Sequence, residues 1–288
     1  MQTFVHVLVI LDRPSAGVLV ARAVELSRRT GAGLTLACLP DEGDAVSPID
    51  SWLQSLGAAA PGAALRTLDR GSGDEIVGIV RREGHDLVMK TAASEGLLPQ
   101  LQLTLDEQLL RDCPCPVWLD RQAGRRGRIL AAIDPQPPGL AAAVLDMASW
   151  LAAIEQAELH VVHGWELEGE SAMRGQALTQ AAEAEIDALA EAERARHAAA
   201  IEALLEPYGR GPAAPALHLE KGQADIVVPQ QVEALGAGLL VMGSVTEGGL
   251  GGLVMRNTAE EVLPRIGCTL VAVKPAGPAS NVPPDEGR

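Results

Sequence analysis

Short hydrophobic runs recur along this chain of 288 residues, and Gly, Pro or charged residues separate them. Most of these runs are apolar at successive positions, which is typical of parallel strands that are buried on both faces. The pattern predicts ten strands, near residues 4–11, 33–39, 63–69, 86–91, 115–120, 127–133, 158–164, 214–219, 238–243 and 269–274. Helical patterns lie between them. Alternating strands and helices predict an α/β fold.

Two of the intervening segments carry a clear helical pattern. Residues 16–31 place apolar side chains on one face and end in Gly31, a residue that commonly stops a helix. Residues 175–209 predict one long Ala/Glu-rich helix that Pro207 and Gly209 terminate. Its charged face is predicted to be solvated. Its apolar stripe consists of Leu178, Ala182, Ile186, Leu189, Ile201, Leu204 and Leu205.

The chain repeats itself. The segment FVHVLVILDRP, which contains Asp12, matches RGRILAAIDPQ, which contains Asp134. Three further pairs follow in the same order: GLTLACL with ELHVVHGW, GHDLVMK with GAGLLVMG, and EQLLRDCPCPVWLD with EEVLPRIGCTLVAV. We infer two tandem doubly wound open sheets, each with five parallel strands, in residues 1–122 and 123–275. Residues 276–288 have no apolar pattern and are predicted to be a disordered tail.

The charge balance narrows the range of partners. The formal net charge is −15, and only 2% of the residues are aromatic. Nucleic-acid and membrane binding both need clustered Lys and Arg, so we expect neither partner. The first apolar run is too short to span a bilayer and has no basic leader before it, so we expect a cytoplasmic protein.

The four cysteines predict neither a disulfide framework nor a metal site. Cys113 and Cys115 have one residue between them, a spacing that fits neither a thioredoxin-like pair nor a zinc knuckle. Cys38 and Cys268 are far away in sequence. We expect buried structural thiols.

In doubly wound sheets, ligands bind beyond the C-terminal ends of the strands. In the second unit this rule selects Asp134, the segment Val162 to Gly164, and the stretch VMGSVTEGGLGGLVMRNTAEEVL from Val241 to Leu263. In that stretch a strand ends at Gly243, a glycine-bearing loop follows from Ser244, and Asn257 or Thr258 caps a helix. Such a helix start suits a phosphate; an ordinary cap after a mobile surface loop is the alternative.

Single residues carry further alternatives. Asp134 is placed to bind a ribose or a base edge, or else to cap the following helix, whose start the Pro residues of DPQPP suit. His160 and His163 have odd spacing on one strand and face opposite ways, so they cannot share a metal, although His163 is placed to line a pocket. In the first unit, Lys90 at the strand end is expected to pair with a neighbouring carboxylate, with binding of an anion as the alternative, and Thr104 is expected to lie near a helix cap. No catalytic motif and no nucleophile–base pair is visible.

Residues 226–275 resemble the C-terminal part of a universal stress protein domain. The segments EGHDLVMKT and LRDCPCPVWL resemble the degenerate first domain of the tandem branch of that family. The resemblance covers nearly the whole chain. It implies an adenine nucleotide alpha hydrolase-like fold with five parallel strands in each unit. It also implies that the two units pair through their last strands as a pseudo-dimer, and that two chains associate as a homodimer.

Many members of the family bind ATP through a glycine pattern: Gly, two residues, Gly, nine residues, then Gly followed by Ser, Thr or Asn. In this chain the positions fall on Gly243, Thr246, Arg256 and Asn257. Thr246 and Arg256 depart from the pattern, because a side chain there blocks the close approach that glycine permits. Arg256 can instead contact a phosphate.

The resemblance therefore implies a regulatory stress-response protein that binds ATP or a related adenine nucleotide in its second unit, with Mg only alongside the nucleotide. The alternative is a scaffold or a binder of another small molecule that has lost nucleotide binding. We expect at most slow ATP hydrolysis, because the sequence shows no set of metal-binding carboxylates and no base that could activate water. The candidate ligand-binding residues are Asp134, Val162, His163, Gly243, Ser244, Arg256, Asn257 and Thr258.

Overall fold

The computed structural model describes residues 4–12, 16–40, 55, 58–93, 103–121, 127–136, 139–209, 214–244 and 257–275. The predicted boundary between the units and the predicted tail at 276–288 lie outside these residues. All ten predicted strands are confirmed. They are β1 (His6–Leu11), β2 (Gly33–Cys38), β3 (Ala64–Thr67), β4 (Leu87–Thr91), β5 (Val117–Asp120), β6 (Arg128–Ala132), β7 (Glu158–Trp165), β8 (Ala216–Lys221), β9 (Leu239–Gly243) and β10 (Thr269–Val273).

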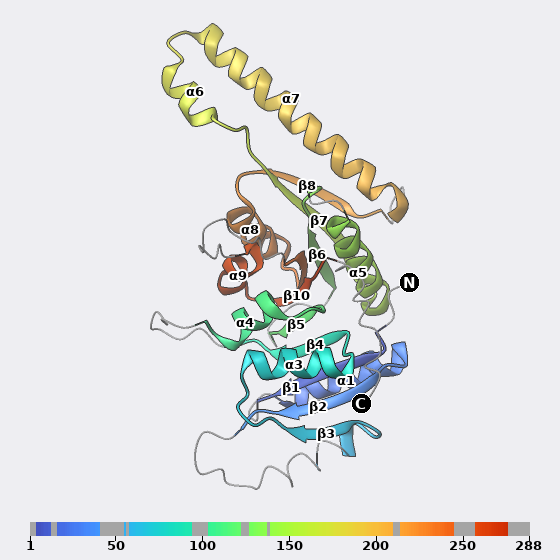
Figure 1. Ribbon diagram of the computed structural model, residues 1–288. Helices are drawn as coiled ribbons and strands as arrows, with labels where there is room; N and C mark the ends of the chain where they lie inside the picture. The colour runs from blue at the N-terminus through green and yellow to red at the C-terminus, as the bar shows by residue number, and fades with distance from the viewer. Residues whose placement is uncertain are drawn as a thin grey trace, which may run out of the picture.

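Helices cover both faces of the sheet (Figure 1). They are α1 (Ala16–Thr30), α3 (Gly73–Glu83), α4 (Leu105–Asp112), α5 (Leu140–Glu155), α6 (Glu170–Gln176), α7 (Gln180–Leu205), α8 (Ala224–Leu235) and α9 (Thr258–Val262), with 3-10 turns η2 (Glu206–Tyr208) and η3 (Leu263–Arg265). Buried side chains of α1 and α5 form one core layer, and those of α3, α4, α8 and α9 form the other.

The two predicted sets of five strands are present, and they form the two halves of one continuous ten-stranded sheet. The strand order is β3-β2-β1-β4-β5-β10-β9-β6-β7-β8. All pairs within each unit are parallel, whereas β5 and β10 pair antiparallel, with Trp118 opposite Val271. The last strands of the two units thus join them, in the manner that the family resemblance implies.

The long helix predicted for residues 175–209 is wrong in its first turns. The chain forms α6, breaks at 177–179, and starts α7 at Gln180. The break has a local cause, because the Thr179 hydroxyl accepts the Ala182 N–H and caps a new helix. Leu178, predicted to be on the apolar stripe, is 94% exposed in the break, while Ile186 and Ile201 are buried.

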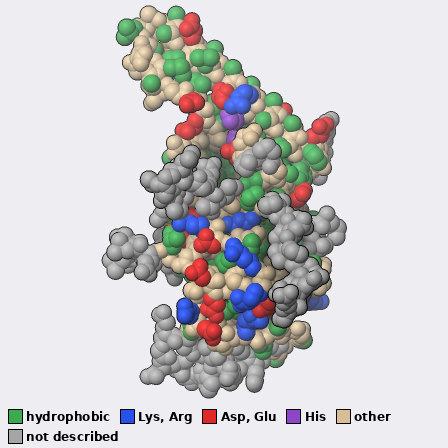
Figure 2. Space-filling view, viewed as in Figure 1, with side chains coloured by type: hydrophobic (Ala, Val, Ile, Leu, Met, Phe, Trp, Pro, Cys, Tyr) green, Lys and Arg blue, Asp and Glu red, His purple; other side chains and the backbone are tan. Residues whose placement is uncertain are grey.

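The α6–α7 arm reaches beyond the sheet (Figure 1), so its outer half has little of the protein to pack against. Leu189 on α7 is accordingly exposed. In Figure 2, hydrophobic side chains gather on this arm, whereas basic and acidic side chains are interspersed over the first unit. The apolar stripe therefore predicted burial correctly for Ile186 and Ile201 and wrongly for Leu178 and Leu189.

We call the β5–β10 pair, together with α4 and α9 beside it, the seam. An ion pair across the seam joins Arg111 on α4 to Glu260 on α9. The guanidinium donates to both carboxylate oxygens, at 3.2 and 2.7 Å, and the Glu260 side chain is fully buried. The Ser244 hydroxyl donates to the Leu110 carbonyl at 2.7 Å, and the Lys274 ammonium donates to both Leu110 O and Ser244 Oγ.

The substitution Arg111→Met tests the seam. It leaves the buried Glu260 carboxylate without its cation, so we expect the free energy of unfolding to fall by about 3 kcal/mol in chemical denaturation. Arg194→Met, which removes an exposed i,i+3 pair with Glu191, is the matched control and should cost less than about 1 kcal/mol.

Adding Glu260→Gln to Arg111→Met removes the stranded charge and should restore part of the loss. Equal losses for Arg111→Met and Arg194→Met would show that the buried pair contributes nothing special to stability.

Candidate functional site

A cavity of about 750 Å³ opens at the C-terminal ends of β6, β7 and β9. It is the size of a small-molecule site. Six of the eight residues predicted from the sequence line it: Asp134, Val162, His163, Gly243, Asn257 and Thr258. Most of the remaining wall is apolar and comes from β6, α5, α8 and β9, with Ala132, Leu140, Val144, Val228 and Met242. The topology rule for doubly wound sheets thus selected residues that the fold brings together.

Asp134 stands exposed at the rim, directly after β6. Its Oδ1 accepts the Gln136 N–H at 2.9 Å, so one carboxylate oxygen stabilises the turn after β6. The alternative prediction, that Asp134 caps the following helix, is wrong, because Gly139 is the N-cap of α5. Oδ2 has no hydrogen-bond partner among the described residues. Asp134 can therefore hold the turn and still offer one oxygen to a ligand hydroxyl or amino group.

His163 is buried in the wall of the cavity, and its tautomer follows from its contacts. Nδ1 lies 2.9 Å from the Ile133 carbonyl, which can only accept, so Nδ1 carries the proton. Burial lowers the pKa of His163, although the Ile133 carbonyl and the Asp134 charge act in the opposite direction. The neutral ring then presents the Nε2 lone pair, which accepts from His197 Nδ1 at 2.7 Å.

His197 on α7 connects the long arm to the cavity wall. Its Nε2 lies 3.2 Å from both Glu193 Oε1 and an Arg196 guanidinium nitrogen, and its ring lies beside Trp165 of β7. The sequence did not predict that His197 contacts the cavity wall. It lies 34 residues after His163, and nothing in the helical pattern around it indicates contact with a strand. His160 contacts His218 instead, so the two histidines of β7 do not share a partner.

Asn257 is the N-cap of α9, as predicted, since its Oδ1 accepts the Glu260 N–H at 3.0 Å. Its Nδ2 donates to Ser244 Oγ and to Glu260 Oε1, both at 3.2 Å. Both ends of the amide are thus engaged within the protein. The buried Glu260 carboxylate in the first turn also offsets the positive end of the helix dipole, which a phosphate would otherwise meet.

Ser244 does not line the cavity. It is buried behind Asn257, where it donates to Leu110 and accepts from Asn257 and Lys274. Its place is in the seam, where its N–H also donates to the Val273 carbonyl of β10 at 2.8 Å. Arg256, Thr246 and the glycines of the loop lie outside the described residues.

Packing against Leu140 favours glycine at position 243, whether or not a ligand binds there. A Cβ at this position would lie 2.6 Å from Leu140 Cδ2 and 3.0 Å from Leu140 Cγ. The first helical residue of α5 therefore rests directly on the end of β9. Gly243 satisfies the glycine pattern, but its presence does not by itself indicate a nucleotide.

The corresponding position in the first unit holds an ion pair. Lys90 at the end of β4 contacts Asp106 at 2.7 Å, and both side chains are buried. Thr104 is an N-cap, and it forms a capping box with Glu107. The predicted pairing of Lys90 with a carboxylate is thereby confirmed.

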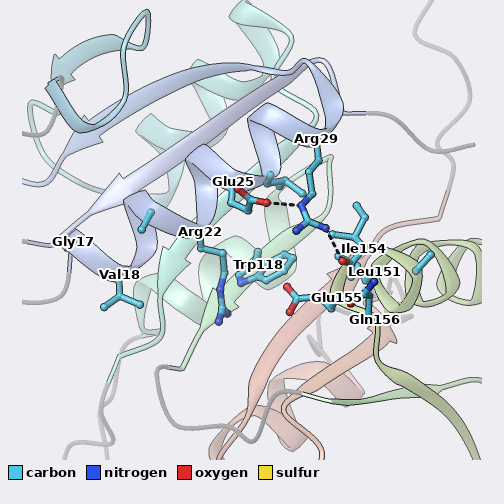
Figure 3. Close-up of a pocket in the computed structure, with 13 residues that line it drawn as sticks. Gly17, Val18, Arg22, Glu25, Arg29, Trp118, Leu151, Ile154, Glu155 and Gln156 are labelled. Atoms are coloured by element: carbon cyan, nitrogen blue, oxygen red, sulfur yellow. Dashed lines mark hydrogen bonds and ion pairs between the residues drawn. The ribbon is translucent and has the colours of Figure 1, made fainter.

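A second cavity, of about 770 Å³, lies between α1 and α5 (Figure 3). Its cations have partners within the protein. Arg29 donates to Glu25 and to the Ile154 carbonyl. Arg22 pairs with the buried Asp120, and its guanidinium lies over the Trp118 ring. The cavity in the second unit is the better candidate site, because it collects strand ends, a rim carboxylate and a helix start.

The described residues contain neither a candidate metal-binding cluster nor a candidate membrane-spanning helix. Among them, no three His, Cys, Asp or Glu side chains form a group that could hold a metal ion. Within the same part of the chain, no helix has both the length and the apolar character needed to cross a membrane.

Comparison with known sequences gives one family. The family model described as "Universal stress protein family" matches residues 125–274. Universal stress protein E of Escherichia coli K12 is 30% identical over 201 residues, which cover 67% of this chain and 61% of that protein. The homologue from Haemophilus influenzae is 27% identical over 209 residues. The match thus spans less than two thirds of the length of the E. coli relative.

Comparison with solved structures extends over nearly the whole chain. A putative universal stress protein from Pseudomonas aeruginosa UCBPP-PA14 is similar with a TM-score of 0.72 and 26% identity, covering 94% of both chains. A functionally unknown protein from P. aeruginosa PAO1 matches with the same score and identity, over 94% of this chain and 93% of that one. A universal stress protein from Archaeoglobus fulgidus, 17% identical with a TM-score of 0.60, shares the fold.

The buried state of His163 predicts a pH dependence. Because its pKa in the folded state lies below the ordinary 6.5, the unfolded chain takes up the proton first as the pH falls. The stability contribution is complete above pH 6.5 and is lost as the pH falls through the lower folded pKa. We expect the drop in unfolding free energy from neutral to mildly acidic pH to be smaller in His163→Asn, by up to about 1 kcal/mol.

Denaturation curves across this pH range check the prediction. His85 and His218, whose pKa values burial also lowers, preserve part of the slope in the variant. A slope identical to that of the unmodified protein would contradict the role assigned to His163.

Proposed function

The chain belongs to the universal stress protein family, and from this premise we propose that it is a stress-response protein that acts by binding, with an adenine nucleotide in the cavity of its second unit. One observation carries the proposal: residues that lie as far apart in sequence as Asp134, His163 and Thr258 line a single cavity at the strand ends. In this family, the same edge of the sheet is where ATP is commonly bound.

The lining of the cavity supports a division of roles. Its apolar side, with Leu140, Val144 and Val228, suits the flat face of a base. Asp134 at the rim is placed for a ribose hydroxyl or a base amino group. Phosphates would extend toward the start of α9 at Thr258, and any Mg would arrive with them, since the described residues offer no metal cluster.

A second candidate is a binder of a different, uncharged small molecule, or a scaffold. The specific observation in its favour is the start of α9, where Glu260 is a buried anion and the Asn257 amide is already engaged. Thr246 and Arg256 on two of the glycine positions point the same way. In this alternative the cavity and the family fold are kept, and only the phosphate contacts are lost. Homodimer formation and a cytoplasmic location stay predictions for either candidate.

Isothermal titration with ATP and Mg tests the proposal. We expect one ATP per chain. Asp134→Ala should weaken binding by roughly tenfold, which corresponds to the loss of one hydrogen bond to a charged group. Asp12→Ala is the matched control, because Asp12 follows the first strand of the first unit as Asp134 follows that of the second. It should leave the affinity unchanged.

No heat at millimolar ATP would reject nucleotide binding and favour the second candidate. Equal effects of Asp12→Ala and Asp134→Ala would contradict the assignment to the second unit.

A further inference from the structure

Two thiols lie in contact beside the seam. Cys113 ends α4, Cys115 comes just before β5, and their sulfur atoms are 3.6 Å apart. Only Pro114 separates them. Cys113 has extended backbone angles, and in an extended segment side chains two residues apart point to the same side. The sequence spacing that argued against a thioredoxin-like motif therefore still brings the two sulfurs together.

The internal repeat shows that this pair is particular to the first unit. Aligning EQLLRDCPCPVWLD with EEVLPRIGCTLVAV places Cys115 opposite Cys268 and Cys113 opposite Ile266. The fold needs a small buried residue at the first of these positions in both units. At the second it accepts an ordinary apolar side chain. The second unit thus carries a matched single thiol, Cys268, and burial raises its pKa to about 11.

The surroundings of Cys113 favour a thiolate. Hydrogen bonds from the Cys115 thiol and from the Cys115 N–H lower the pKa of Cys113, burial opposes them, and the charges of Lys274 and Arg81 add to the lowering. The thiol of Cys115 has its pKa raised, chiefly by the same hydrogen bond and by burial. The two thiols therefore share one hydrogen bond, and their surroundings favour a thiolate on Cys113 over one on Cys115.

We propose that Cys113 and Cys115 form a redox-modification site, which a peroxide converts into an intramolecular disulfide. The Cys113 thiolate attacks one peroxide oxygen, the O–O bond breaks, and hydroxide leaves and is protonated to water. The product is a sulfenic acid on Cys113. Cys115 then attacks the Cys113 sulfur, the S–O bond breaks, and a second water leaves. In sum, two thiols and one hydrogen peroxide give one disulfide and two waters.

The burial of both thiols limits the oxidant to a small molecule. The exposed fractions of Cys113 and Cys115 are 2% and 7%. Hydrogen peroxide is scarcely larger than water, so a small local opening admits it, whereas a bulky disulfide reagent needs far more room. The segment is also connected to the seam, since the Leu110 carbonyl one turn before Cys113 accepts from Ser244 and Lys274. The proposal does not depend on nucleotide binding.

The experiment uses the full chain under native conditions. After treatment with hydrogen peroxide, the protein is denatured, its remaining thiols are alkylated, and it is digested with trypsin. Cleavage after Arg111 and Arg121 places both cysteines in one peptide. We expect this peptide to lack both alkyl groups and to have lost two hydrogen atoms, while Cys38 and Cys268 are alkylated.

Single substitutions separate the two steps. Cys115→Ser should leave a sulfenic acid on Cys113 that dimedone traps, because the resolving thiol is missing. Cys113→Ser should leave Cys115 reduced and alkylatable. Cys268→Ser is the matched control and should not change the formation of the disulfide. Alkylation of Cys113 and Cys115 to the same extent as Cys268 after peroxide treatment, or a disulfide between chains, would overturn the proposal.

Discussion

The antiparallel pairing of β5 with β10 is the constraint on which the rest of the architecture depends. Each five-stranded unit alone would end in a strand with unpaired backbone groups, and such edges invite aggregation. Because both units end on a strand of the same kind, pairing these two strands removes two edges in one step. The remaining edges, β3 and β8, are more exposed and carry charged side chains such as Arg66, Glu220 and Lys221.

The same pairing places helices of the two units against each other and so connects the seam to the cavity. Glu260 contacts Arg111 of the first unit, and it also accepts from the Asn257 amide at the start of α9. Ser244 links Leu110 of the first unit to Asn257. The helix start that faces the cavity is thus held from across the seam. Any ligand that contacts Asn257 meets a group whose position the first unit helps to fix.

The positions of the strands could be predicted from local patterns in the sequence, because each strand is a short apolar run between polar residues. The internal repeat predicted the two five-stranded units. The rule that ligands bind beyond the C-terminal ends of the strands predicted residues that line the cavity. Contacts between distant segments could not be foreseen: Arg111 and Glu260 are 149 residues apart, and His163 and His197 are 34 apart. The split between α6 and α7 was missed for the opposite reason. A local hydrogen bond from the Ala182 N–H to the Thr179 hydroxyl starts a new helix, although the helical periodicity of the sequence continues through this point.

The two units differ in the partners that the same type of helix start contacts in each of them. Both α4 and α9 begin with a polar cap followed three residues later by a glutamate. In the first unit Glu107 folds back onto Thr104, and Lys90 with Asp106 occupies the strand end as a buried ion pair. In the second unit Arg111 draws Glu260 toward the seam, and the strand ends in Met242 and Gly243, which line the cavity. A buried lysine needs its carboxylate, so the first unit cannot open at this point without stranding a charge. The corresponding strand end of the second unit carries Gly243 in place of Lys90, and it lines the cavity where a ligand is proposed.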